Sequence, residues 1–367
     1  MSFRTVIAKT ILLPCSKIYG AVTYMRNKFF DWGILKQHEF EVPIIVVGNL
    51  TVGGTGKTPH VEHIVEAMRH SHHVAVLSRG YKRRTKGFVL ANNRSTPRDI
   101  GDEAFQIYHK FGGEIVMAVC EDRVKGINEL LKIDPMINLI VLDDAFQHRY
   151  VKPRVAILIT EYGRPVYDDK LLPYGRLRES VRGMTRADIV ITTKCPDDIT
   201  ALNYRLVSKH LELFPYQSLF FSKYVYQNLV PLFPDAVHSV PVLEWMGKND
   251  TILAVAGIGN PRPFVRYLKS FLPRVKVNVF PDHHNYSRKD IEFLKNRYNS
   301  MKGDSRIIIT TEKDAVRLSC NPYFPHELKA VTFYLPIEVE FINRSNSDEF
   351  ADAIRKYIKE NDPATNA

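Results

Sequence analysis

The segment from residue 42 to residue 69 constrains the fold of this chain more than any other. It begins with an unbroken apolar and largely β-branched run, VPIIVVG at 42–48, and ends in apolar positions spaced three and four apart at 61, 64, 65 and 68. An uninterrupted apolar run is typical of a strand buried on both faces, as at the centre of a parallel sheet. The second spacing predicts a helix that follows this strand directly. Together they predict the first unit of a doubly wound α/β sheet.

The residues between this strand and helix have the chemistry of a phosphate-binding loop. Glycines let backbone N–H groups converge on phosphate oxygens, a lysine reaches the β- and γ-phosphates, and a threonine hydroxyl can ligate Mg²⁺. A strict G-x-x-x-x-G-K-[ST] motif needs glycine at the position of Thr51, so a glycine-rich turn with a chance Lys-Thr pair is the alternative. The strand–loop–helix context favours a P-loop. We predict that the nucleotide is bound by Thr51, Val52, Gly53, Gly54, Thr55, Gly56, Lys57 and Thr58.

Carboxylates stand at two further points where the sheet is expected to end. Asp143 and Asp144 close the apolar run LIVLDD, where P-loop enzymes place an acidic residue toward the metal, and helix capping is the alternative role. Asp102 opens a helical segment at about 101–111. It is first of all a good capping residue. Its expected place at the carboxyl ends of the strands, where open α/β sheets bind ligands, makes it a candidate general base.

Histidines and basic residues complete the set of candidates. Asp282, His283 and His284 follow an expected strand at 275–280, and because no third ligand stands at a usual spacing we favour an acid–base or orienting role over a zinc site. Basic side chains follow several strands of the first half. Their natural partner is phosphate, and a solvated basic face is the alternative. These side chains are Arg79, Lys82, Arg83, Arg84, Lys86, Arg123, Arg149, Arg176, Arg178 and Arg182.

The chain is long enough for two domains. Its 367 residues exceed what one core usually covers, and strand and helix patterns alternate on both sides of a proline-interrupted, aromatic stretch. We predict a P-loop domain at 36–215, an extended hairpin-like linker at 216–248 and a smaller α/β domain at 249–367. The four cysteines are far apart in the sequence, which indicates a reducing compartment and neither a disulfide framework nor a zinc site.

Residues 1–35 form a separate region. Its first 30 residues carry five basic side chains, no acidic one, and apolar positions that fit one helical face, with Pro14 as a break or the first turn of a second helix. The apolar stretch between Lys9 and Lys17 is too short for a signal peptide, and no run in the chain approaches a membrane span. Such a helix can lie at a membrane surface or pack against the protein body.

Seven segments of the chain together carry a family resemblance. They are VVGNLTVGGTGKTP at 46–59, SRGY at 78–81, GDEA at 101–104, VLDDAFQHR at 141–149, LPYGRLRES at 172–180, DHH at 282–284 and TEKDAVR at 311–317. In this order they resemble the tetraacyldisaccharide 4′-kinases, the lipid A 4′-kinases of Gram-negative bacteria. The family's own loop sequence also accounts for the missing glycine at position 51.

The resemblance implies transfer of the ATP γ-phosphate to the 4′-hydroxyl of a tetraacylated, 1-phosphorylated glucosamine disaccharide. Carried onto this chain, it makes Asp102 the general base, assisted by His283, with Lys57 on the phosphates. Thr58, Asp143, Asp144 and Glu179 would surround Mg²⁺. The protein would act peripherally at the cytoplasmic face of the inner membrane, and residues 1–30 would contact that membrane. Neither a nucleic acid nor an obligate protein partner is implied.

Two other classes of function are weaker alternatives. A P-loop NTPase switch or metallochaperone would use nucleotide hydrolysis to drive protein binding, but the guanine-specific form needs N/T-K-x-D and Thr193-Lys194-Cys195-Pro196 lacks the aspartate. A nucleic-acid-binding protein is supported only by the net charge of +11, from 51 basic against 40 acidic side chains.

Overall fold

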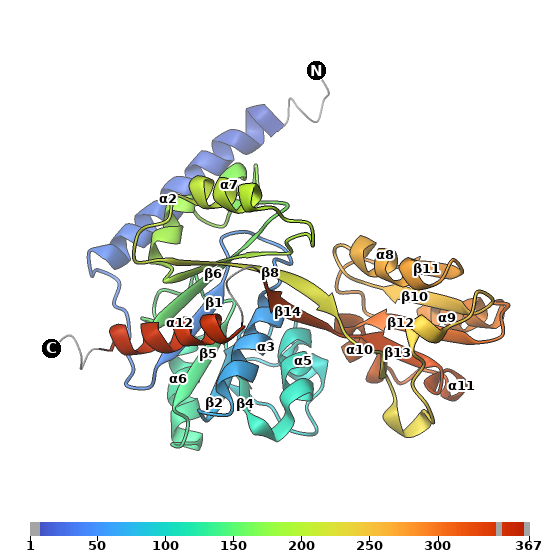
Figure 1. The fold of residues 1–367 in the computed structure, drawn as a ribbon. Coiled ribbons are helices and arrows are strands. Elements are labelled where there is room, and N and C mark those ends of the chain that lie inside the picture. The colour runs from blue at the N-terminus through green and yellow to red at the C-terminus, as the bar shows by residue number, and fades with distance from the viewer. Residues whose placement is uncertain (1–7, 343–346, 363–367) are drawn as a thin grey trace.

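The chain forms two α/β lobes of unequal size joined by a pair of strands (Figure 1). The computed structural model describes residues 8–342 and 347–362. A large sheet has the strand order β14-β8-β7-β6-β1-β5-β2-β4-β3, and a smaller one has the order β11-β10-β12-β13-β9. The prediction of a doubly wound, mostly parallel sheet with a second, smaller α/β unit is confirmed.

The large sheet is parallel from β4 through to β8, and its two edge strands, β3 and β14, run antiparallel to their neighbours. Central strand β1 lies within the apolar run VPIIVVG at 42–48. The strands are β1 (Ile44–Gly48), β2 (Val74–Ser78), β3 (Val89–Leu90), β4 (Val116–Val119), β5 (Leu139–Asp143), β6 (Val155–Glu161), β7 (Ile189–Thr193), β8 (Ser218–Tyr226) and β14 (Ile337–Phe341).

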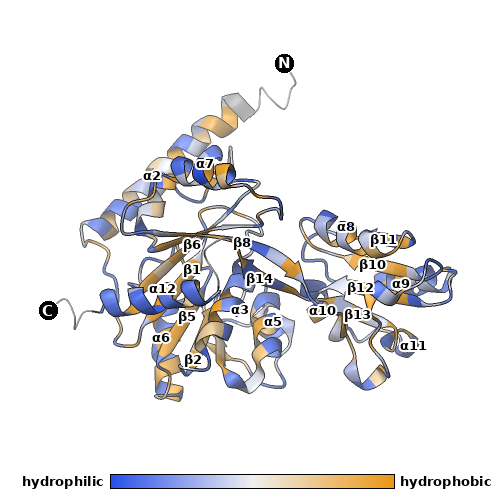
Figure 2. Cartoon of the chain, viewed as in Figure 1, coloured by the Kyte–Doolittle hydropathy of each residue, from blue (hydrophilic) through white to orange (hydrophobic). Residues whose placement is uncertain are grey.

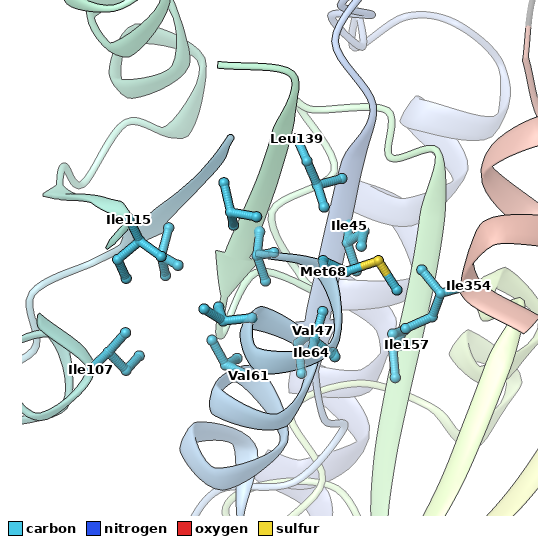
Figure 3. Close-up of a cluster of buried hydrophobic side chains, with 14 of the residues drawn as sticks. Ile45, Val47, Val61, Ile64, Met68, Ile107, Ile115, Leu139, Ile157 and Ile354 are labelled. Carbon is cyan, nitrogen blue, oxygen red and sulfur yellow. The ribbon is translucent and has the colours of Figure 1, made fainter. Parts of the chain in front are cut away.

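Helices cover both faces of this sheet, and two apolar clusters form its core. One cluster joins α3, α5 and α12 to one face, and the other joins α6 and α7 to the opposite face. Figure 3 shows Val61, Ile64 and Met68 of α3 packed against Ile45 and Val47 of β1. The helices are α3 (Lys57–Met68), α4 (Pro97–Ile100), α5 (Asp102–Phe111), α6 (Arg123–Ile133), α7 (Ala201–Leu211) and α12 (Ser347–Glu360), with short 3₁₀ turns η2 (Gly112–Glu114), η3 (Val166–Asp168) and η4 (Val181–Arg186).

The smaller lobe repeats the same layering. Its strands β11, β10, β12 and β13 are parallel, and β9 joins antiparallel to β13. Helix α8 packs on one face, and α9 and α10 pack on the other. The elements are β9 (Val230–Pro231), η5 (Pro234–Ala236), η6 (Leu243–Trp245), β10 (Thr251–Ala256), α8 (Arg262–Phe271), β11 (Val275–Val279), α9 (Arg288–Asn299), β12 (Arg306–Thr311), α10 (Glu312–Ser319), α11 (His326–Lys329) and β13 (Thr332–Leu335).

The strand pairings cross the domain boundaries that the sequence suggested. β8, expected in the linker, extends the large sheet by pairing in parallel with β7. β14 and α12, expected in the second domain, return to the first lobe, where β14 pairs with β8 from Ile337↔Tyr226 to Phe341↔Ser222. The alternating sequence IEVEF of β14 suits an edge strand with one buried face. The smaller lobe therefore lies between β8 and β14 in the sequence, and these two strands lead into and out of it.

The N-terminal region forms a short π-helical turn, η1 (Ala8–Leu12), and a long helix, α2 (Leu13–Asp31). Pro14 lies in the first turn of α2, as one of the two alternatives had it. In Figure 1, α2 lies against one side of the large lobe and extends beyond it. Among the described helices, none combines the length and the apolar character needed to cross a bilayer. The expected helical positions before residue 8 lie outside the described residues.

Candidate active site

The glycine-rich loop connects β1 to α3, as predicted. Gly53 and Gly56 have φ angles of 109° and 90°, in the region that favours glycine, and Gly56 is the residue immediately before α3. Gly56 also lacks room for a side chain, because a Cβ would overlap the hydroxyl of Tyr224. Asn49 Nδ2 donates to Thr55 Oγ1 at 2.7 Å and holds the loop from inside. The loop therefore presents its backbone at a helix N-terminus, the arrangement that binds phosphate.

The segment LPYGRLRES lies along the outer side of this loop. Thr51 and Leu177 form an antiparallel bridge, and Arg178 N donates to Leu50 O at 2.7 Å. Arg176 donates from its guanidinium to Val52 O at 3.1 Å. Arg176 and Arg178 therefore lie next to the predicted phosphate-binding loop, as a phosphate-binding role for these side chains requires.

A fully buried histidine lies between the loop and strand β8. His60 Nδ1 lies 2.8 Å from Gly56 O, and its Nε2 lies 2.9 Å from Ser222 Oγ of β8. Since a carbonyl only accepts, Nδ1 carries the proton and Nε2 accepts from the serine hydroxyl. Burial is the main cause that lowers the pKa of His60 to about 4. His60 thus connects the loop to β8 as a neutral ring.

Asp143 and Asp144 lie at the carboxyl end of β5, next to β1 in the sheet. No helix follows them, so neither acts as the helix cap that was the alternative. Lys57 Nζ lies 3.5 Å from Asp144 Oδ1, and Arg178 NH1 donates to the same oxygen at 3.1 Å. Asp143 is buried, and its Oδ1 has no hydrogen-bond partner among the described residues.

The two carboxyl groups are in opposite electrostatic situations. Burial, and then the nearby Glu103 and Asp144, raise the pKa of Asp143 to about 7. Burial also raises the pKa of Asp144, but the charges of Lys57 and Arg178 outweigh it, so the net shift is downward. A cation placed beside Asp143 would favour its ionised form and give its free oxygen a partner.

Glu179 has a different environment from the one expected of a metal ligand. Both of its oxygens accept from the Arg186 guanidinium, at 2.8 and 2.9 Å. Gln147 Nε2 donates to one oxygen at 3.1 Å and Asn27 Nδ2 of helix α2 to the other at 2.9 Å. To ligate a metal, Glu179 would have to give up some of these bonds. Its present contacts instead join α2 to the segment beside the P-loop.

Asp102 and His283 meet across the two lobes. Asp102 is the first residue of α5, and Gly101 rather than Asp102 is the N-cap, so helix capping does not account for the side chain. His283 follows β11 and has a positive φ of 61°. Its Nδ1 lies 3.3 Å from Asp102 Oδ2. The two residues are 181 positions apart in the sequence.

The smaller lobe brings two further cations to this pair. Arg317 of α10 forms an ion pair with Asp102 through NH2 and also donates from Nε to Oδ1 at 3.1 Å. Lys313 Nζ lies 2.9 Å from His283 Nε2. Burial raises the pKa of Asp102, but hydrogen bonds from His283 and Arg317 and the charge of Arg317 outweigh it and lower the pKa to about 2. His284 pairs instead with Asp290, at 3.1 Å.

Packing links Asp102 to the end of the large sheet at which the P-loop lies. Gly101 lies directly against Gly80 and Tyr81, which follow β2, and a Cβ at residue 101 would lie 2.8 Å from Tyr81 O. Ser78, the last residue of β2, donates from Oγ to Asp143 Oδ2 at 3.4 Å. The candidate base and the candidate metal ligands thus belong to one end of the large sheet.

Several of the basic candidates have structural partners. Arg83 donates to Gly87 O and pairs with Glu121, and buried Arg123 donates to Cys120 O and Asp143 O. Burial lowers the pKa of Arg123 to about 10. Arg149 pairs with Asp31 at the end of α2. These three guanidinium groups position loops and helices.

Sequence reasoning assigned no role to His60, Lys313 or Arg317. His60 lies two residues after Thr58, and its contact with β8 gives no local signal. Lys313 and Arg317 lie within the segment TEKDAVR, and their separation of four residues on a predicted helix could have indicated that both lie on one face. The partner of Lys313, His283, is 30 positions away in the sequence, whereas the partner of Arg317, Asp102, is 215 positions away.

The phosphate-binding loop follows the carboxyl end of β1. A lysine, two aspartates and a separate carboxylate–imidazole pair lie at the same end of the sheet. Such a site can hold a nucleotide and take up a proton from an acceptor. This fold and site define a P-loop kinase. Comparison with family models narrows the class, because residues 8–359 match the family Tetraacyldisaccharide-1-P 4′-kinase. The chain belongs to that family.

Individual relatives agree with the family match. The chain is 49% identical to a tetraacyldisaccharide 4′-kinase of Bacteroides thetaiotaomicron over 95% of this chain and 93% of that one. It is 46% identical to a tetraacyldisaccharide 4′-kinase of Phocaeicola vulgatus over 97% and 96% of the two chains. A crystal structure of LpxK from Aquifex aeolicus in complex with ATP superposes with a TM-score of 0.72 at 28% identity, covering 97% of this chain and all of that one.

Proposed function

We propose that this chain transfers the γ-phosphate of ATP to the 4′-hydroxyl of a tetraacyldisaccharide 1-phosphate. Family membership supports the reaction and the acceptor, and the similarity to a structure in complex with ATP supports the donor. The contact of Asp102 with His283 is the observation that carries the mechanism. The contact supports a role for Asp102 as the group that receives the hydroxyl proton, with His283 as its partner.

The P-loop would position the donor. Backbone N–H groups of residues 51–56 would bind the nucleotide phosphates, and Lys57 would neutralise charge on the transferred group. In the present structure Lys57 lies beside Asp144, so nucleotide binding would redistribute this cation between two anions. Phosphoryl transfer gains mostly from such positioning and charge neutralisation.

Thr58, Asp143 and Asp144 are the residues we propose for Mg²⁺. Their chemistry fits, since hydroxyl and carboxylate oxygens suit this ion and the buried Asp143 Oδ1 lacks a partner among the described residues. The part of the chain that the structure describes has no group of three or more His, Cys, Asp and Glu side chains able to hold a metal. Phosphate oxygens would therefore share the ion, as is usual for Mg²⁺ at nucleotide sites. When bound, it would neutralise charge on those phosphates. For Glu179 we propose an organising role between α2 and the loop.

Asp102 would act as the general base. As the bond from the acceptor oxygen to phosphorus forms, the bond from phosphorus to the ADP oxygen breaks and ADP keeps the electron pair. The hydroxyl proton passes to Asp102. His283 orients the carboxylate through Nδ1, which lies 3.3 Å from Oδ2.

Helix α2 would contact the cytoplasmic face of the inner membrane. Two of its polar side chains face the protein: Ser16 donates to Leu171 O at 2.8 Å, and Tyr19 donates to Arg178 O at 2.7 Å. Apolar side chains face outward instead, including Ile18 and Val22, which are 66% and 63% exposed. Figure 2 shows hydrophobic and hydrophilic residues alternating along this helix. An apolar face directed away from the body, with basic residues beside it, is suited to a lipid surface and supports peripheral association.

Transfer of radiolabel from ATP to the lipid disaccharide tests the reaction. The parent should label the lipid, whereas a nucleotide-hydrolysing switch would release phosphate without labelling it. Release of phosphate alone in the presence of acceptor would contradict the proposal.

A double-mutant cycle tests the base. Asp102→Ala and His283→Ala should each lower kcat by about two to four orders of magnitude, and the double variant should be little worse than the poorer single variant. If the two losses in kcat multiply in the double variant, Asp102 and His283 act independently. Retention of nucleotide binding by Asp102→Ala, measured by calorimetry, controls for loss of the P-loop.

A further inference from the structure

The face of α10 directed at the larger lobe carries two cations that meet the Asp102–His283 pair. Arg317 contacts both oxygens of Asp102 and also donates from NH1 to His284 O at 3.3 Å. Its side chain is 9% exposed and that of Asp102 is 13% exposed, so little water reaches the pair. A guanidinium that spans both oxygens of a carboxylate has the strong, directional geometry of a bidentate ion pair.

His283 lies between the two cations of α10. The Lys313 ammonium group, which can only donate, lies 2.9 Å from Nε2. Arg317 NH2, which is also only a donor, lies 2.8 Å from Nδ1 and forms the ion pair with Asp102 Oδ2. Nδ1 itself lies 3.3 Å from that carboxylate oxygen. Arg317 NH2, His283 Nδ1 and Asp102 Oδ2 therefore form one close cluster.

Asp102 is therefore covered in this structure. Its oxygens are bonded to donors from the smaller lobe, and a group in this state is a poor acceptor for another proton. The other charged or titratable groups nearby are Glu103 on the same helix, Tyr81 against the His283 ring, and Asp282, which pairs with Lys313 at 3.2 Å. Arg317 is the cation in direct contact with the carboxylate.

We propose that Arg317 is a positioning residue that keeps Asp102 covered until the acceptor hydroxyl enters and takes the place of one guanidinium hydrogen bond. The proposal rests on the proposed role of Asp102 as the base. Its consequence is selectivity for the acceptor over water. With Asp102 covered, water cannot deliver its proton there while its oxygen attacks the γ-phosphorus and ADP departs with the electron pair. ATP is thus protected from hydrolysis when no lipid is present.

Replacing Arg317 with glutamine tests this inference. The variant Arg317→Gln should hydrolyse ATP without acceptor at least about tenfold faster than the parent, because the base is then available to water. Removing the cation while burial remains should also raise the pKa of Asp102 from its low value. The pH profile of kcat/KM for the kinase reaction should therefore show a decrease at acidic pH. The ratio of kcat/KM at pH 7.5 to kcat/KM at pH 5 should be about threefold higher in the variant than in the parent.

Three further variants make the result decisive. Arg317→Lys keeps the charge and loses the bidentate contact with Asp102. The increase in ATP hydrolysis and the change in the pH profile should therefore both be intermediate. Arg297→Gln removes an exposed arginine of the same lobe and should leave both measurements at the parental values. Asp102→Ala should abolish the excess hydrolysis when combined with Arg317→Gln.

Parental hydrolysis and a parental pH profile in folded Arg317→Gln would overturn the inference. If thermal unfolding shows that this variant is not folded, the same two results in Arg317→Lys overturn it. Failure of the proposed base itself would be recognised separately, since Asp102→Ala alone would then retain kinase activity.

Discussion

The buried histidine beneath the P-loop leads to a quantitative prediction about stability. His60 is inaccessible to solvent, donates to Gly56 O and accepts from Ser222 Oγ. Its pKa of about 4 lies below the ordinary value of 6.5. The unfolded chain therefore binds a proton on this residue more readily than the folded chain does, so protonation favours unfolding. Stability from this group is complete above pH 6.5 and is lost as the pH falls from 6.5 toward 4.

The size of the effect follows from the two pKa values. The difference between 6.5 and about 4 is about 2.5 pKa units, which at about 1.4 kcal/mol per unit amounts to about 3 kcal/mol. His60→Gln removes the titration. At pH 7 the variant should be less stable than the parent by about 1–3 kcal/mol, because a buried partner loses its hydrogen bond. That deficit should shrink steadily below pH 6.5 and reach zero or reverse near pH 4.5.

Amide hydrogen exchange in β1 and α3 provides a suitable measurement, since it reports the free energy of opening for this lobe alone. Parent and variant would be compared at matched pH values from 7 to 4.5. Other titrating groups are present in both proteins and cancel in the difference. His70→Gln, which removes a largely exposed imidazole of the same lobe, is the control. A stability difference that stays constant over this pH range would refute the argument that the fold holds His60 neutral.

Three further predictions concern the loop and the N-terminal helix. Lys57→Ala should fold normally and lower kcat by about three orders of magnitude, because a cation on the transferred phosphate is lost; turnover within about threefold of the parent would contradict the P-loop role. Thr58→Ala should raise the Mg²⁺ concentration needed for half-maximal activity by about tenfold, and a titration curve identical to the parent's would count against a ligand role. Replacing both Ile18 and Val22 with glutamate should abolish sedimentation with anionic vesicles and raise KM for lipid more than KM for ATP, without lowering the melting temperature; Lys289→Glu on the exposed face of α9 is the charge control, and an equal rise in both KM values would favour a packing role.

The order of the strands and helices could be predicted from local pattern to a large extent. The run VPIIVVG at 42–48 contains β1, and the P-loop joins this strand to helix α3, as the sequence pattern predicts. Such elements are specified by their own residues, since an unbroken apolar, β-branched run has few alternatives to a buried strand.

The return of the chain to the first lobe could not be predicted in the same way. The alternating sequence of β14 specifies a half-buried strand but not the sheet that it joins, and its partner β8 lies more than 100 residues earlier. Helix α2 illustrates the same limit. Its sequence predicts an amphipathic helix, whereas the hydrogen bonds of Ser16 and Tyr19 decide which face meets the protein. The partners of Asp102, His283 and Arg317, likewise lie 181 and 215 positions away.

The pairing of β8 with β14 has a consequence for how such a protein can arise and be engineered. Tyr226 and Ile337 are paired neighbours, and Gln227 N donates to Pro336 O at 3.0 Å, so the entry and exit of the intervening segment are adjacent in space. A short turn between these ends would convert the two strands into an ordinary hairpin. The smaller lobe thus has the topology of a module inserted into a complete P-loop domain, at a place where closely spaced ends tolerate insertion. In such a lineage the phosphate-binding half would have preceded the half that supplies His283, Lys313 and Arg317.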